Sequence, residues 1–231
     1  MNVLKGNAGE GGGGGTTNLA FQGGSVETAP AVYIVYWGSW WNGTSTTGTD
    51  GGYEYGPLTA KANIEGFFGN VGESTWDGVN SQYCQNVAVG RVTCGASGTR
   101  IQNLKSQMDG SYVDASTSVP RKPTQSQIAA DAVRVAQHFG FSPTIQRIAT
   151  VFVLTPSGSS ISGFGTSWCA WLSSTNDGGV HLPYAYLPYQ PDAGRNCGEN
   201  FVNSTSSQIS QFGNGYFDGF SVVGGHEYAE A

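Results

Sequence analysis

Three residues near the end of the chain have the types and the spacing of a metal-dependent hydrolytic site. His226, Glu227 and Glu230 form an H-E-x-x-E motif that follows the apolar residues 220–223. On a helix, His226 and Glu230 are four residues apart and lie on one face, so both could ligate one metal ion. Glu227 is rotated by about 100° from His226, close enough to activate a metal-bound water as a general base. The motif predicts a zinc site with His226 and Glu230 as metal ligands and Glu227 as the catalytic base.

The motif supplies two ligands, whereas a catalytic zinc usually takes three protein ligands and one water. We expect the third ligand from a segment after Ala231 or, as the second choice, from His181. A loop histidine that binds backbone groups is the more ordinary role for His181. His138 falls late in a predicted helix, where a cation interacts favourably with the helix dipole, so a structural role is expected for it. The alternative for the motif itself is a solvated helix end with Glu227 and Glu230 outside, because carboxylates are common on exposed helices.

Two adjacent tryptophans are the candidate substrate-binding residues. Trp40 and Trp41 lie in a turn that follows an apolar run. Two neighbouring indoles in a turn cannot both point inward easily, so at least one is expected on a binding surface. The substrate expected there is an extended peptide or a cell-wall polymer. The alternative is that these aromatic side chains pack in the core and the loops.

The composition excludes several classes of function. Charged residues make up 11% of the 231 residues, well below the ~25% of an ordinary soluble domain. The chain has 36 glycines, only ten Lys and Arg, and a net charge of −6. This gives no basis for a nucleic-acid partner. No stretch approaches the ~18 apolar residues of a membrane-spanning helix. The weakly charged, polar surface suits a secreted protein or one that packs closely against neighbours.

Four cysteines favour an oxidising compartment. They fall into two groups, Cys84 with Cys94 and Cys169 with Cys197, and no C-x-x-C pair suggests a structural zinc site. Pairing in sequence order is the simplest of the three possible disulfide arrangements. Two such disulfides are typical of an extracellular protein.

The apolar patterns predict an α/β (α+β) protein that holds these candidate residues. Residues 31–37 and 147–154 are apolar and rich in β-branched or aromatic side chains, as in buried strands. Between the two strands, residues 124–139 have one apolar stripe, with Thr124 as a possible cap. A helix between two apolar strands indicates a crossover and a sheet covered on at least one face. Further helices are expected over residues 57–68 and 220–231, whereas no clear helix is expected over residues 71–123.

The expected organisation is a Gly-rich arm followed by one domain. Residues 1–24 include five consecutive glycines, 11–15, and are too costly in conformational entropy to form a packed element. They are interpreted as a flexible or peripheral arm. Residues 25–231 are interpreted as a single α/β domain.

Several segments, taken in order, resemble one known family. They are NLAFQGG at residues 18–24, VYIVYWGSW at 32–40, LPYAY at 182–186, the cysteines Cys169 and Cys197, and VVGGHEYAE at 222–230. This series is similar to the plant EXORDIUM (phosphate-induced protein 1) family, and more so to its bacterial secreted relatives. The resemblance covers the chain from about residue 18 to its end. Two features differ. Relatives continue past the H-E-x-x-E motif, and they carry a histidine shortly after the cysteine that corresponds to Cys169, where this chain has the sequence AWLS at residues 170–173.

The resemblance implies an extracellular protein with a zincin-like fold. That fold would combine a mixed sheet, a backing helix and a C-terminal H-E-x-x-E helix. The expected function is a secreted, zinc-dependent hydrolase, related to metallopeptidases, that acts on extracellular peptide or cell-wall material. The alternative is a non-catalytic extracellular protein, either a wall-binding module or a self-associating structural subunit. A glycosidase would need two carboxylates across a cleft, with Glu227 as one candidate.

Overall fold

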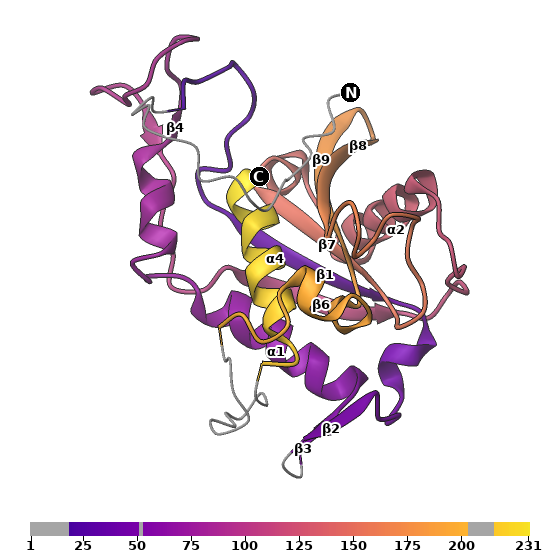
Figure 1. Cartoon of the computed structure of the whole chain (residues 1–231). Helices are drawn as coiled ribbons and strands as arrows, with labels where there is room; N and C mark the ends of the chain where they lie inside the picture. Colours follow the sequence, from indigo (N-terminus) through magenta and orange to yellow (C-terminus); the bar gives the residue numbers. More distant parts are fainter. Residues whose placement is uncertain (1–18, 51–52, 203–214) are drawn as a thin grey trace.

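One mixed sheet organises the part of the chain that the structure describes. The computed structural model describes residues 19–50, 53–202 and 215–231 (Figure 1). In the sheet, β1, β6, β7 and β9 are parallel to one another, while the edge strand β8 runs antiparallel to β9. The strand order across the sheet is β6 (Met108–Asp114), β1 (Ala31–Trp37), β7 (Ala149–Thr155), β9 (Val180–Pro188) and β8 (Trp171–Asp177).

The two strands predicted from apolar runs form the centre of the sheet. β1 begins and ends as expected, and β7 covers Ala149–Thr155 instead of residues 147–154. All residues of both strands are buried. A parallel strand covered on both faces needs apolar side chains at every position, which explains the uniform sequence. Alternate residues of β1 and β7 enter two separate hydrophobic clusters, one on each face.

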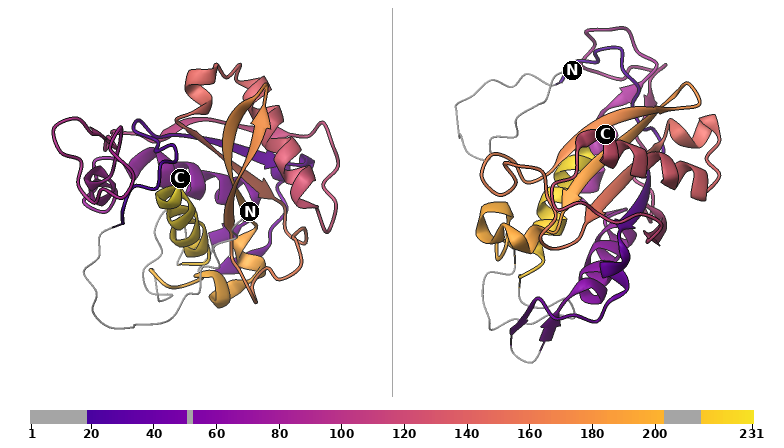
Figure 2. Two further views of the ribbon diagram at one scale, coloured as in Figure 1. Left: turned by 90° about the horizontal axis from the view of Figure 1, so that it is seen from above. Right: turned by 90° about the vertical axis from the view of Figure 1, so that its right-hand side faces the viewer.

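Helices cover both faces of the sheet. α1 (Pro57–Asn70) and α4 (Asp218–Glu230) pack on one face, and α2 (Gln125–His138) packs on the other (Figure 2). The predicted helix over 124–139 is confirmed together with its cap, because Thr124 accepts a hydrogen bond from the Gln127 amide and Gln127 accepts one in return. This is the capping box of an α-helix. The predicted helices over 57–68 and 220–231 correspond to α1 and α4.

The sequence patterns do not predict the strands β6, β8 and β9. The β8 sequence WLSSTND is mostly polar because β8 is an edge strand. β9 contains Pro183 and Pro188. Proline is rare within strands, so the sequence pattern indicates a loop for this segment. Pairing of β9 with β7 runs only from Tyr184 to Pro188. Pro183 therefore lies outside the central ladder, where its missing N–H would cost a hydrogen bond.

Short elements connect the sheet and the helices. The two-stranded pieces are β2 (Gly48–Asp50) with β3 (Tyr53–Tyr55) and β4 (Cys84–Gln85) with β5 (Thr99–Arg100). α3 (Pro143–Gln146) precedes β7. The 3-10 helices are η1 (Ser39–Asn42), η2 (Asp77–Gln82), η3 (Gln190–Asp192) and η4 (Gly194–Cys197).

Both disulfides form in sequence order. Cys84 bonds Cys94, and Cys169 bonds Cys197. The second bond ties the segment before β8 to η4, which follows β9. The predicted arm over residues 1–24 lies largely outside the described residues, which begin at 19. In the described part, none of the helices has the length and apolarity needed to cross a bilayer.

Replacing Gly72 by alanine should destabilise the fold because no room exists for a side chain there. A Cβ at Gly72 would lie 1.7 Å from the Leu104 carbonyl oxygen. The backbone would have to shift, at a cost of about 1–3 kcal/mol for overpacking. Gly69→Ala is the matched control, since a Cβ there meets nothing within 4 Å. Urea unfolding should show a loss for Gly72→Ala and no loss for Gly69→Ala. Equal stability of the two variants would contradict the tight contact with Leu104.

Candidate functional site

Helix α4 carries the predicted site residues and lies close to its neighbours. A Cβ at Gly224 would lie 3.6 Å from side-chain atoms of both Leu187 and Phe68. A Cβ at Gly225 would lie 3.2 Å from the Phe67 ring. The contact at Gly225 is tighter than an ordinary one, whereas a Cβ at Gly224 would be at ordinary van der Waals distance, so Gly225 is the position where a glycine favours close packing of α4 on α1. This packing sets which face of the last helical turn points inward.

His226 and Glu230 meet on the outer face of α4. The Nε2 atom of His226 lies 2.9 Å from Oε1 of Glu230, one helical turn later. Their side chains are 56% and 37% exposed. Both donor atoms therefore converge and are open to solvent, as the four-residue spacing predicts. The arrangement is either an exposed i,i+4 pair or two preplaced ligands of one cation.

Glu227 lies inside, between the outer face of α4 and the sheet. Its residue is only 4% exposed, and its Oε2 atom has no hydrogen-bond partner among the described residues. Burial, and then the charge of Glu230, raise the pKa of Glu227 to about 8. The burial of Glu227 excludes the alternative that this residue lies on a solvated helix end. A carboxyl group with a pKa near neutrality is suited to accept and return a proton.

The described residues do not supply a third ligand next to this pair. Among residues 19–50, 53–202 and 215–231, no group of three or more His, Cys, Asp and Glu is arranged to hold a metal ion. His181 is exposed on β9, beside the buried Leu182. His138 stacks on Tyr112 with ring centroids 3.9 Å apart. His138 thus has a packing contact of the structural kind expected for it.

The tryptophan pair divides into a buried residue and a half-buried one. Trp41 has no exposed surface and contacts the rings of Tyr36 and Tyr189. Its assignment as a substrate-binding residue is therefore corrected, because a ligand cannot reach a ring that is enclosed in the core. Trp40 is half-buried and packs edge-on against Tyr189, with centroids 5.3 Å apart. Trp40 remains the candidate for substrate contact.

Tyr228 of α4 belongs to a cluster of buried polar residues that the sequence does not predict. The hydroxyl group of Tyr228 faces the Asp77 carboxylate, and this contact together with burial raises the pKa of Tyr228. Asp77 also accepts a hydrogen bond from Gln107 Nε2 at 3.2 Å. Nearby, burial raises the pKa of Glu27 to about 7, although a hydrogen bond from Thr150 lowers it. These residues come from distant segments of the chain, so no local spacing could indicate that they meet.

A shallow pocket lies away from the predicted site. It has a volume of about 260 Å³ and is lined by residues 43–46 and 54–59, at the start of α1. None of the predicted site residues lines it.

The fold and site define a disulfide-bonded α/β protein with a helix that exposes a His-Glu pair and buries a second glutamate. Comparisons of the chain with protein-family models, with curated proteins and with solved structures find no match in any of the three. The resemblance to the EXORDIUM family therefore stays a prediction from the sequence motifs.

Trp41→Ala should cost far more stability than Trp40→Ala. Truncating a fully enclosed aromatic residue costs about 3–5 kcal/mol, because it leaves a cavity. Trp40 is half-buried, so its loss removes less contact area. The free energy of unfolding in urea should separate the two variants by about 1 kcal/mol or more. A mild effect of Trp41→Ala, equal to that of Trp40→Ala, would contradict the enclosed position.

Proposed function

We propose that this chain is a secreted, zinc-dependent hydrolase of the metallopeptidase type that acts on extracellular peptide or cell-wall material. One observation carries the proposal. The last turn of α4 brings His226 Nε2 and Glu230 Oε1 within 2.9 Å of each other at the surface, and Glu227, next to His226 in sequence, is buried with an oxygen that has no partner among the described residues.

The donor set suits zinc. Imidazole nitrogen and carboxylate oxygen are both ordinary zinc ligands. His226 and Glu230 would hold the ion, and a bound zinc would supply a Lewis acid that polarises the substrate carbonyl. The third protein ligand would come from outside the described residues, because no group of three His, Cys, Asp or Glu side chains, His181 included, is arranged to hold a metal among the described residues. His226 and Glu230 already share one helical face, so few rotations are needed to bind.

Glu227 would serve as the general base. Burial and Glu230 raise the pKa of Glu227 to about 8, and a cation held by His226 and Glu230 would favour the ionised form again. In that form the buried Oε2 atom, which has no donor among the described residues, can accept a proton from a water molecule at the reacting carbonyl. The same carboxyl group can then give the proton to the leaving amine. Partial enclosure keeps bulk water away from this proton transfer, which strengthens the electrostatic interactions at the site.

The surrounding architecture supports the zincin-like part of the proposal. A mixed sheet has α1 and α4 on one face, and the motif-bearing α4 follows the last strand, β9. This is the combination of a sheet, a backing helix and a motif helix that the resemblance implies. The two disulfides are compatible with an extracellular location. Trp40 is the proposed contact for the substrate.

The missing third ligand favours a second candidate function. Without a group of three metal-binding side chains among the described residues, the chain would be a non-catalytic extracellular protein that binds wall polymers or associates with itself. Its low charge, 11% Asp, Glu, Lys and Arg, fits closely packed polar interfaces.

The hydrolase proposal predicts about one zinc ion per chain, lost on His226→Ala or Glu230→Gln. Removing a direct ligand should weaken zinc binding by more than the ~10–100-fold that loss of an outer-shell partner costs. Native mass spectrometry and zinc titration measure both. His138→Ala is the matched control, because His138 is a helix histidine that stacks on Tyr112, and it should leave zinc binding unchanged. A folded wild-type chain that takes up no zinc would support the non-catalytic alternative.

Glu227→Gln should slow hydrolysis strongly while zinc stays bound. Loss of a general base lowers kcat by about 10²–10⁴-fold, whereas the ligand atoms of His226 and Glu230 are untouched. The measurement is cleavage of a quenched fluorescent peptide library by the zinc-loaded chain, with zinc content determined in parallel. Unchanged kcat in the zinc-loaded variant would rule out Glu227 as the base.

A further inference from the structure

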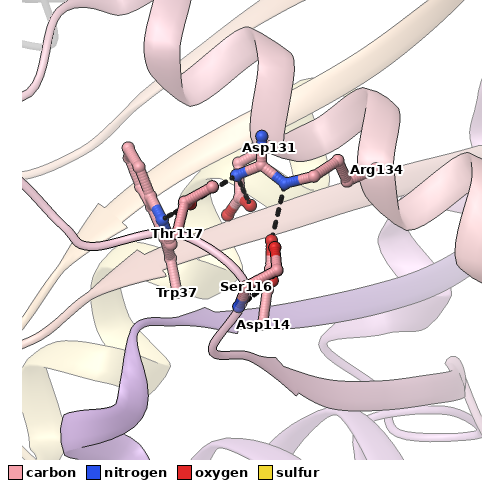
Figure 3. Close-up of polar contacts among 6 residues, drawn as sticks. All are labelled: Trp37, Asp114, Ser116, Thr117, Asp131 and Arg134. Carbon is pink, nitrogen blue, oxygen red and sulfur yellow. Dashed lines mark hydrogen bonds and ion pairs between the residues drawn. The ribbon is translucent and has the colours of Figure 1, made fainter.

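A second cluster of ionisable residues lies on the opposite face of the sheet from α4. Asp114 is the last residue of β6, and Asp131 and Arg134 lie on α2 (Figure 3). Arg134 Nε lies 2.6 Å from Asp114 Oδ2, and Arg134 Nη2 lies 2.5 Å from Asp131 Oδ1. One guanidinium group therefore bridges two carboxyl groups.

The charges in this cluster do not balance if both acids are ionised. Asp131 has no exposed surface and Asp114 is 5% exposed. The Oδ2 atom of Asp131 receives no hydrogen bond from a donor among the described residues. Two buried negative charges beside one arginine leave one carboxylate uncompensated, which is costly at low dielectric. A proton on Asp131 removes the excess charge and turns the second oxygen into a donor toward Asp114.

We propose that Asp114 and Asp131 share one proton and, through Arg134, form an alkaline-sensitive latch that fastens the loop after β6 to helix α2. The loop is tied at several points. Asp114 Oδ1 accepts hydrogen bonds from the amide and the hydroxyl of Ser116, at 2.8 and 2.5 Å. Thr117 Oγ1 accepts hydrogen bonds from Arg134 Nη2 at 3.3 Å and from Trp37 Nε1 at 2.9 Å. Release of the latch would therefore free the loop from α2, while the hydrogen bond from Trp37 would still tie Thr117 to β1.

The surroundings shift the pKa values of the two acids in opposite directions. Burial, and then the Asp114 carboxyl group, raise the pKa of Asp131. Burial also acts to raise the pKa of Asp114, but hydrogen bonds from Ser116, Asp131 and Arg134 outweigh it and hold the pKa of Asp114 below its ordinary range. Such a pair titrates as a unit, and one proton stays on it at neutral pH.

The other groups that face the pair do not replace the proton. Arg134 on α2 is shared by both acids. Tyr112 on β6 senses the charges of both acids and of Arg134, and burial raises its pKa. His138, one turn beyond Arg134, stacks on Tyr112. Among these groups, Arg134 is thus the one that places a permanent positive charge beside the two acids.

The sign of the pH dependence follows from the shared proton. The folded chain holds a proton on Asp131 that the unfolded chain releases above the ordinary value of 3.8. The stability contribution of Asp131 is therefore complete at low pH and falls as pH rises through the folded-state pKa. Ionisation of the second acid leaves two negative charges on one arginine, so the latch opens on the alkaline side.

The decisive measurement is the carboxyl ¹³C NMR titration of the full-length chain between pH 5 and 10. We expect one carboxyl of the pair to stay protonated at pH 7 and to ionise in the alkaline range. Hydrogen exchange of residues 114–119, corrected for intrinsic rates, should rise in parallel as the loop is released. Two fully ionised carboxylates at pH 7, in a folded chain, would overturn the proposal without any variant.

Asp131→Asn is the matched variant, because asparagine copies the neutral acid in size and carries one donor group, the NH2, and one acceptor oxygen. We expect loop protection that no longer changes between pH 7 and 10. Glu54→Gln, on exposed β3, is the control for general charge removal and should keep the wild-type pH response. A wild-type pH response of the loop in Asp131→Asn would also overturn the latch.

Discussion

The close approach of α4 to the sheet is the constraint on which the site depends. Gly224 and Gly225 leave no side chains between the helix backbone and the rings of Phe67 and Phe68. With that side of the helix pressed inward, the helical period gives each motif residue its own environment. His226 faces solvent, and Glu227 faces the interior. A Cβ at Gly225 would lie 3.2 Å from the Phe67 ring and 3.3 Å from the Trp76 ring, so a side chain at this position would require those rings to shift.

The other end of α4 is held by a different set of contacts. A Cβ at Gly219 would lie 2.4 Å from the Cys197 carbonyl oxygen, so α4 begins directly against η4. Cys197 is bonded to Cys169, and Gln190 Nε2 donates a hydrogen bond to the Cys169 carbonyl at 3.0 Å. The disulfide therefore does more than restrict the unfolded chain. It also helps to fix the start of α4. Because a helix is rigid, a fixed start also positions the motif at the other end of α4.

The sequence was sufficient for the parts of the fold that follow one local period. β1 and β7 are apolar at every position, and α2 has a clear stripe with a cap, so all three were predictable. β9 was not, because its prolines obscure a strand whose central ladder begins only at Tyr184. In the site, the helical period predicted that His226 and Glu230 meet. The burial of Glu227 and Trp41 depends on segments distant in sequence, which no local pattern encodes.

Two buried acids show how a structural carboxyl group differs from the candidate catalytic one. Asp131 is enclosed completely, yet Arg134 and Asp114 supply it with a cation and a partner for its proton. Glu227 is nearly as enclosed, and each of the two carboxyl groups has one oxygen without a donor among the described residues, but the charge that acts on Glu227 is the negative charge of Glu230. Buried polar groups are normally satisfied, so each exception needs a physical explanation. A nearby cation would remove the electrostatic cost of ionising Glu227, since it would offset the charge of Glu230. A zinc ion held by His226 and Glu230, as proposed, would be such a cation.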